Sequence, residues 1–152
     1  MKSCFRLVVP VIVALAVSLL AGCGTPPAVA GLGAELAGVK SASDANGFVA
    51  TIRYINGGTR PVAVQSARHE LVIGGRPAGE VVLTAPLGLP PLSSTDREIA
   101  IAGSGNAITR ALLAEAARTP GATWILSSEI IVDNGGDRIV LKSRAGGKLA
   151  GE

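Results

Sequence analysis

The chain has 152 residues, of which 48% are hydrophobic and only 3% are aromatic, and its 14 basic and 11 acidic residues give a net charge of +3. This length is enough for one domain with a core of its own but not for two. The basic residues are scattered singly, which speaks against a nucleic-acid partner. Twenty glycines favour short strands and many turns over a helical bundle.

Residues 1–22 have the three parts of an export signal. Lys2 and Arg6 give a positively charged start, Leu7–Leu20 is an uncharged apolar run, and Ala21 and Gly22 are small. The alternative is a transmembrane anchor, but the run is shorter than the ~20 apolar residues that a spanning helix needs. Removal of this signal peptide would leave 130 residues with a net charge of +1.

The end of this leader, Leu20-Ala21-Gly22-Cys23, resembles the bacterial lipobox. The resemblance implies cleavage between Gly22 and Cys23, with a covalent diacylglycerol and further acyl lipid on the new terminal residue. Each buried acyl CH₂ contributes ~0.8 kcal/mol, so two or three chains form a lasting membrane anchor. Because Cys4 is lost with the leader, the mature chain has no intramolecular disulfide.

The residue after Cys23 indicates which membrane would hold the protein. In Gram-negative lipoproteins an Asp there commonly marks retention at the inner membrane, and here the residue is Gly24. We therefore expect a lipid-anchored protein of the bacterial cell envelope, on the periplasmic face of the outer membrane if the organism has one. The lipidated Cys23 and a tether over 23–33, which contains Pro26 and Pro27, come before a domain over 34–143 and a flexible tail over 144–152.

Alternation of apolar and polar residues predicts most of the domain as strands. In the clearest strand, Phe48, Ala50, Ile52 and Tyr54 share one face. In the next, the polar stretch Arg68–Glu70 predicts a bulge or an edge. The predicted strands are Glu35–Lys40, Gly47–Ile55, Val62–Ile73, Glu80–Thr84, Thr95–Ile101, Thr123–Val132 and Arg138–Lys142.

The connections between these strands read as turns, with one irregular segment and one helix. Gly74-Gly75 and Asp133–Gly136 predict hairpins, and Ala85–Pro91, with three prolines, is expected to be irregular. The helix is predicted over Ala107–Arg118. Asn106 caps the helix, Pro120-Gly121 ends it, and its apolar stripe consists of Ile108, Leu112, Leu113 and Ala116.

These elements predict an all-β fold with one helix. Short turns between consecutive strands favour an antiparallel sheet, since a parallel sheet would need a helix between successive strands. We expect an immunoglobulin- or fibronectin III-like β-sandwich of about seven strands, with the helix before the last two.

The segment Phe48–Ile101 resembles the WHy domain of the type-2 late embryogenesis abundant proteins, a desiccation-related class. Family members carry a strand that ends in Asn-Pro-Asn, with a further Pro about three residues on. Asn56 and Pro61 match this turn motif, whereas Gly57 stands where Pro is usual and Gly58 where the second Asn is. A glycine at 58 keeps access to positive φ, as Asn would.

A second part of the resemblance is the hairpin Leu71–Gly79 with its trailing glycine. Pro91, Leu92 and the run Ser93-Ser94-Thr95 fit the segment that leads to the next strand. The resemblance implies a sandwich and a stress-associated role without enzymatic activity.

The sequence offers little catalytic chemistry. His69 is the only histidine, no Gly-x-Ser-x-Gly motif is present, and a lone strand histidine is expected at a surface or edge. One histidine and dispersed acids predict no metal site, and no cofactor is expected beyond the lipid on Cys23. Gly103-Ser104-Gly105 mimics a dinucleotide loop, but Ile108 occupies the position of the third small residue. Arg53, in mid-strand, either pairs with an acid across the sheet or faces water.

Three functions remain open. The first is a membrane-anchored, non-catalytic WHy-like module for binding or stress protection, with membrane lipid and an envelope protein or apolar ligand as partners; a lipid carrier is a variant of it. The second is a structural or assembly subunit of an envelope complex. The third, least favoured, is an atypical hydrolase around His69. No nucleic-acid partner is expected.

Overall fold

The computed structural model describes residues 29–43, 47–134 and 136–150, which form eight strands and one helix. Helix α2 (Ala107–Ala116) lies before the last two strands, and all strand pairs are antiparallel. The predicted fold class is therefore confirmed. The strands are β1 (Leu32–Ser41), β2 (Phe48–Asn56), β3 (Val62–Ile73), β4 (Arg76–Leu83), β5 (Leu87–Leu89), β6 (Ser93–Ala102), β7 (Thr123–Asn134) and β8 (Asp137–Lys148).

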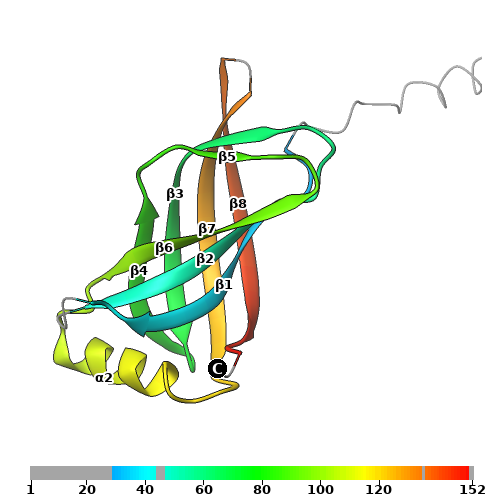
Figure 1. Cartoon of the computed structure of the whole chain (residues 1–152). Coiled ribbons are helices and arrows are strands. Elements are labelled where there is room, and N and C mark those ends of the chain that lie inside the picture. Colours follow the sequence, from blue (N-terminus) through cyan, green and yellow to red (C-terminus); the bar gives the residue numbers. More distant parts are fainter. Residues whose placement is uncertain (1–28, 44–46, 135, 151–152) are drawn as a thin grey trace, which may run out of the picture.

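The strands form one strongly curled sheet in the order β1-β2-β6-β4-β3-β7-β8, with β5 paired to β3. Strand β6 joins the two halves, because it pairs with β2 up to Ala100 and then with β4 through Ile101 and Ala102. As a result β1, β2 and β6 cross over the strands β3, β7 and β8 and face them (Figure 1). This is a sandwich-like arrangement with the core between the two halves.

Gly79 makes the junction of β4 and β6 possible. Its φ of +121° lies outside the range of ordinary side chains, and a Cβ there would collide with the carbonyl oxygen of Ala102 and lie 2.7 Å from Cγ2 of Ile101. The pairing of β3 with β4 also shifts register beside it, between Leu71 and Val72. The trailing glycine of the hairpin is therefore the point where the sheet bends from one half to the other.

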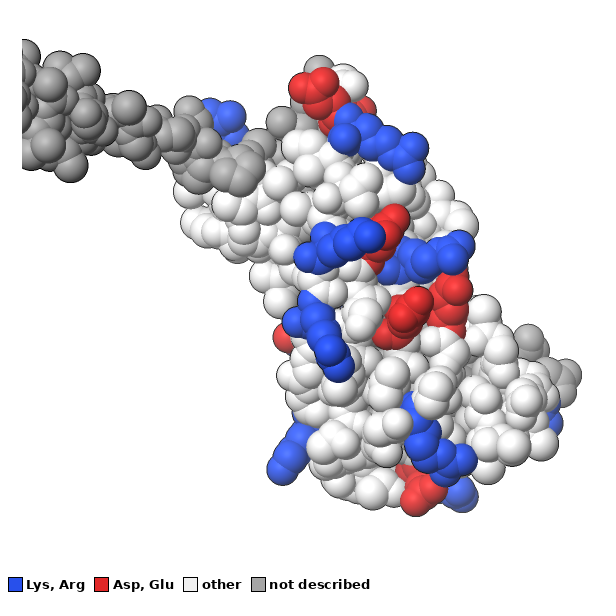
Figure 2. Space-filling view, turned by 180° about the vertical axis from the view of Figure 1, so that it is seen from behind, with Lys and Arg blue, Asp and Glu red and all other residues white. Residues whose placement is uncertain are grey.

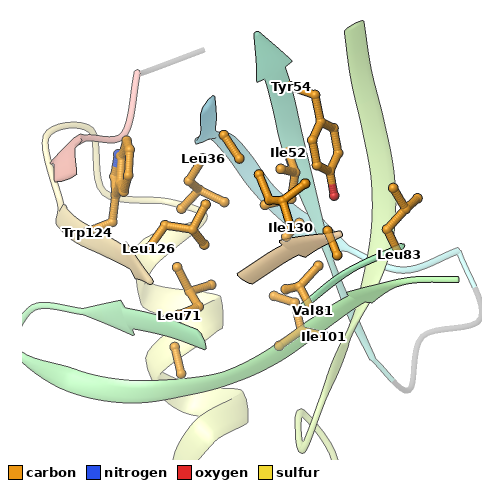
Figure 3. Packing of buried hydrophobic residues seen from close by; sticks show 14 of the residues in the cluster. Leu36, Ile52, Tyr54, Leu71, Val81, Leu83, Ile101, Trp124, Leu126 and Ile130 are labelled. Atoms are coloured by element: carbon orange, nitrogen blue, oxygen red, sulfur yellow. The ribbon is translucent and has the colours of Figure 1, made fainter. Parts of the chain in front are cut away.

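The core is filled by side chains that alternate along the strands. Phe48, Ala50, Ile52 and Tyr54 are all buried, as the period of two predicted. Side chains from both halves interleave (Figure 3). The largest fully buried apolar residues are Tyr54, Ile52, Leu71, Leu89, Leu113, Leu126 and Ile130.

The bulge predicted at Arg68–Glu70 is in the wrong place. The pairing of β3 with β7 shifts between Val64 and Ser66, so Ala67 moves to the buried face. Beyond that point Arg68 and Glu70 simply alternate outward, and β3 is no edge because β4 and β7 flank it. The polar stretch reflects the exposed face of a central strand.

Helix α2 confirms its predicted cap. The Asn106 side chain accepts a hydrogen bond of 2.9 Å from the backbone N–H of Ile108. Leu112, Leu113 and Ala116 are buried, but Ile108 is 67% exposed. The prediction for Ile108 is wrong because only the second half of the helix packs against the sheet.

Two segments are more regular than predicted. Within the expected irregular stretch Ala85–Pro91, β5 pairs with Val62–Val64 of β3. The expected flexible tail is strand up to Lys148, since its residues Arg144–Lys148 pair with Thr123–Ser127 of β7. The glycines that suggested a loose tail are packed: a Cβ on Gly147 would lie 3.0 Å from the Trp124 ring.

Candidate functional site

The turn after β2 is organised by the side chain of Asn56, which is 1% exposed. Its Nδ2 carries two hydrogens and lies 2.8, 2.9 and 3.2 Å from the carbonyl oxygens of Arg60, Pro90 and Leu89, so one hydrogen is shared between two acceptors. Its Oδ1 accepts a 3.0 Å hydrogen bond from the N–H of Gly58. One amide thus ties the β2–β3 turn to the segment between β5 and β6.

Position 58 needs a glycine for a different reason from the one predicted. Its φ is not among the positive values of the described chain, so access to positive φ does not explain it. A Cβ at this position would instead lie 3.1 Å from both the Ala30 carbonyl oxygen and Asn56 Oδ1. Next to it, the N–H of Gly57 donates to the Gly31 carbonyl oxygen at 3.0 Å. The start of the described chain therefore packs directly on this turn.

The third residue of the turn motif, Pro61, directly precedes β3, as predicted, and is exposed. The segment opposite the turn, which the sequence matched to the family only as the lead into the next strand, bonds directly to the turn. Leu92 donates its N–H to the Gly58 carbonyl oxygen at 3.0 Å, and Ser93 Oγ donates to Pro90 at 2.7 Å. No local pattern could couple this segment to Asn56, because more than thirty residues separate them.

Leu92 is unusual in two respects. Its φ of +50° is the one positive value at a non-glycine residue in the described ranges, and a left-handed backbone is disfavoured for a branched side chain. Its side chain is 73% exposed. The hydrogen bonds of the turn thus hold a strained backbone that projects an apolar side chain into solvent.

His69 is not at a surface or an edge, contrary to the prediction, but fully buried. Its Nε2 lies 2.8 Å from the Tyr54 hydroxyl, and its Nδ1 lies 2.8 Å from Ser128 Oγ. Ser128 is the direct β7 partner of His69, whereas Tyr54 comes from β2 across the core. The three side chains form a polar link between the two halves of the sheet.

Burial sets the protonation of this link. Desolvation lowers the pKa of His69 to about 4 and raises the pKa of the Tyr54 hydroxyl. Near neutral pH the imidazole is therefore uncharged and has one donor and one acceptor nitrogen. Both nitrogens have a hydroxyl partner, so the buried ring is satisfied without a charge.

The pair Ser128–His69 has the separation of a nucleophile and its base. However, Ser128 is only 4% exposed, and the other imidazole nitrogen contacts a tyrosine hydroxyl rather than a carboxylate. Both members of the pair are therefore buried side chains of the core.

Arg53 pairs across the sheet, which is one of the two predicted alternatives. Its guanidinium donates to both carboxylate oxygens of Asp96, at 2.8 and 3.0 Å, and lies 3.6 Å from Glu35. The hydrogen bonds from Arg53 lower the pKa of Asp96, and Asp96 raises the pKa of Arg53. All three groups are exposed, so this ladder contributes little net stability.

Gly22 and Cys23, the predicted cleavage and lipidation residues, lie outside the described residues. So does most of the predicted tether. In the described part of the chain, no helix has the length and apolar character that a membrane span needs.

Comparisons of the chain with models of known protein families and with curated proteins give no match. Solved structures do give matches. A crystal structure of a protein from Archaeoglobus fulgidus is similar at 15% identity and a TM-score of 0.43, over 78% of this chain and 98% of that one. A solution structure of an Arabidopsis thaliana protein has 14% identity and a TM-score of 0.47, over 78% and 82%. A solution structure described as that of a late embryogenesis abundant protein has 12% identity and a TM-score of 0.40, over 95% and 85%.

Proposed function

We propose that this chain is a lipid-anchored, non-catalytic module of the bacterial cell envelope, whose WHy-like domain serves in binding or in stress protection of the desiccation type. The observation that carries the proposal is the hydrogen bonding of Asn56, which joins the turn after β2 to the segment between β5 and β6. Asn56 is also one of the two residues, with Pro61, that match the WHy turn motif. A match at a buried residue that defines the turn is stronger support than a match at a solvent-exposed one.

The anchor itself is inferred from the lipobox-like sequence around Cys23. A mature chain that begins at Cys23 would enter the described domain at Val29, close to the Asn56 turn. The anchor and the Asn56 turn would therefore lie at the same end of the domain.

The buried polar groups support a role without catalysis. Tyr54, His69 and Ser128 satisfy one another inside the core, so their hydrogen-bonding groups are occupied in the folded state. Binding or protection would then be carried out by the outer surface. There, Lys, Arg, Asp and Glu side chains alternate over the sheet rather than forming a field of one sign (Figure 2).

The lipid-carrier variant has less support. The space between the two halves of the sheet is occupied by large side chains. A groove of about 750 Å³ lies outside, over β1, β2, β6 and the residues after α2. Its walls carry the ion pairs Lys40–Glu98 and Arg53–Asp96, and charged walls are a poor environment for an acyl chain.

The second candidate, an assembly subunit, is favoured by one observation. In the described chain β1 pairs only with β2, so it forms an edge of the sheet to which a partner could add a strand. Strand β8 is the other edge, but Arg138, Lys142, Arg144 and Lys148 share its outward positions and discourage strand addition. A partner of this kind would add to β1.

The anchor is tested by expressing the full chain in a bacterium that processes lipoproteins, with a labelled fatty acid and intact-mass analysis. We expect acylated protein in the membrane fraction, and loss of label, processing and membrane binding in Cys23→Ser. Cys4→Ser is the matched control, since it changes a cysteine of the leader and should leave all three intact. A Cys23→Ser chain that is still processed and membrane-bound would contradict the anchor.

The protective role is tested on dye-loaded vesicles of phosphatidylethanolamine and phosphatidylglycerol that carry the lipidated protein. After drying and rehydration, we expect more dye to be retained than in vesicles with an equal mass of an unrelated lipoprotein. Equal retention would contradict protection. Recovery of a stoichiometric partner from gently solubilised membranes would favour the assembly subunit instead.

A further inference from the structure

One end of the domain presents an apolar surface around Leu92. This Leu92 end consists of Ala30, Gly58, Arg60, Pro90, Pro91 and Leu92, of which all but the half-buried Gly58 are exposed. Contacts to the backbone hold these residues together: the Leu92 N–H donates to the Gly58 carbonyl oxygen, Gly58 lies against Ala30, and the Asn56 side chain joins Arg60 to Pro90. Five of the six are apolar residues or glycine, and the sixth is basic.

The described domain begins next to this surface, at Val29 and Ala30. Val29, the first described residue, follows Cys23 by six positions, which span at most about 20 Å when fully extended. The twelve-residue strands β3 and β7 are each about 40 Å long. Helix α2 lies at the far end of these strands (Figure 1). A lipid on Cys23 would therefore keep the Leu92 end close to the bilayer and the α2 end away from it.

We propose that the Leu92 end rests on the membrane that holds the Cys23 lipid, with the Leu92 side chain in the boundary between headgroups and acyl chains. This rests on the proposed lipid anchor and adds to it a fixed orientation of the domain. The chemistry fits a lipid surface: an exposed leucine beside two prolines can enter the interface without burying a charge, and Arg60 can remain among anionic headgroups.

The rigidity of the segment supports this role. Pro90 receives hydrogen bonds from both Asn56 and Ser93, and Leu92 is held by Gly58 in a left-handed conformation that a leucine disfavours. The side chain that is held in this way is directed outward rather than into the core. A strained backbone that exposes a large apolar group points to a partner for that group.

The test uses the full chain, processed and acylated in a bacterium and reconstituted into vesicles of phosphatidylethanolamine and phosphatidylglycerol. Single cysteines replace Leu92, Ile108 and Val140 in separate proteins and carry a polarity-sensitive fluorophore. Ile108 is the matched control, since it is a similarly exposed apolar residue at the far end, on α2, and Val140 reports on the outer face of β8. Urea unfolding checks that each variant is folded.

We expect blue-shifted emission at position 92 and quenching by nitroxide-labelled lipids that is several-fold stronger than at 108 or 140. Equal quenching at all three positions, or stronger quenching at 108 or 140, would overturn the proposed orientation. Intact mass separates this from failure of the anchor. An acylated chain with a water-exposed position 92 overturns only the orientation, whereas a chain without acyl groups overturns the proposed function and this inference together.

Discussion

The side-chain amide of Asn56 donates a 2.9 Å hydrogen bond to the carbonyl oxygen of Pro90, across 34 residues of chain. The same nitrogen also bonds to Arg60 and Leu89, so the turn and the distant segment fold as one unit. Any residue supplies a backbone carbonyl oxygen as acceptor. These hydrogen bonds therefore depend on the amide side chain at position 56 and not on the side chains of its partners.

Replacement of Asn56 by Asp should therefore destabilise the domain strongly. A carboxylate would face three carbonyl oxygens without a proton to donate, and removal of buried donors leaves their partners unpaired. We expect the free energy of unfolding in urea to fall by about 3 kcal/mol or more. The control Asn106→Ala removes one exposed helix cap and should lower it by only about 1 kcal/mol. Similar losses in the two variants would contradict the role given to Asn56.

His69 should make stability depend on pH. Its pKa is about 4 in the folded protein, below the ordinary value of 6.5, so between these values the unfolded chain binds more protons. The free energy of unfolding should be highest above pH 6.5 and fall by about 3 kcal/mol as the pH drops towards 4. Urea unfolding at a series of pH values measures this. His69→Gln, which cannot titrate, should flatten the curve in this window; parallel curves would argue against a buried neutral imidazole.

Ionisation of the Tyr54 hydroxyl should make stability depend on pH at alkaline pH as well. Burial raises its pKa above the ordinary value of 10, so stability is complete below pH 10 and falls as the pH rises above it, where only the unfolded chain ionises. Because Tyr54 is the only tyrosine, ultraviolet absorbance reports its ionisation directly. We expect no tyrosinate signal until the protein unfolds. A tyrosinate that forms near pH 10 while circular dichroism stays native would show that the hydroxyl is accessible.

Gly79→Ala should disrupt the junction of β4 and β6. The new methyl group would collide with the backbone of Ala102, and alanine disfavours the φ of +121°. We expect a loss of about 3 kcal/mol or more in the free energy of unfolding. Gly88→Ala is the matched control, because β5 offers open space at that position and an ordinary φ. If both substitutions have the same small effect, the close approach at Gly79 is not required.

Leu92→Asn tests whether the leucine side chain contributes to stability or whether its left-handed backbone costs stability. Asparagine tolerates a left-handed backbone better than leucine, so the free energy of unfolding should stay equal or rise by up to about 1 kcal/mol. Thermal unfolding of the wild type and the variant measures the difference. A marked loss of stability would mean that the Leu92 side chain supports the fold itself.

The sequence by itself determined the order and type of most elements, because strand alternation, turn residues and helix caps are local. Val62–Ile73 was predicted with the bounds that β3 has, and the inward residues of β2 and the cap at Asn106 followed from periodicity and side-chain chemistry. The turn residues also predicted that the chain turns between Asn56 and Pro61, directly before β3. What such patterns report is the conformation of neighbouring residues along the chain.

Only the tertiary structure decided which residues meet across the sheet. His69 looks like an exposed polar residue of β3, and only the register with β7 and the crossing of β2 give both of its nitrogens a buried partner. The partners of Asn56, the collision space at Gly79 and the packing of Gly147 on Trp124 are likewise set by distant segments. A hydrogen bond or a steric contact depends on distance in space, and once the sheet curls, that distance no longer follows from separation along the chain.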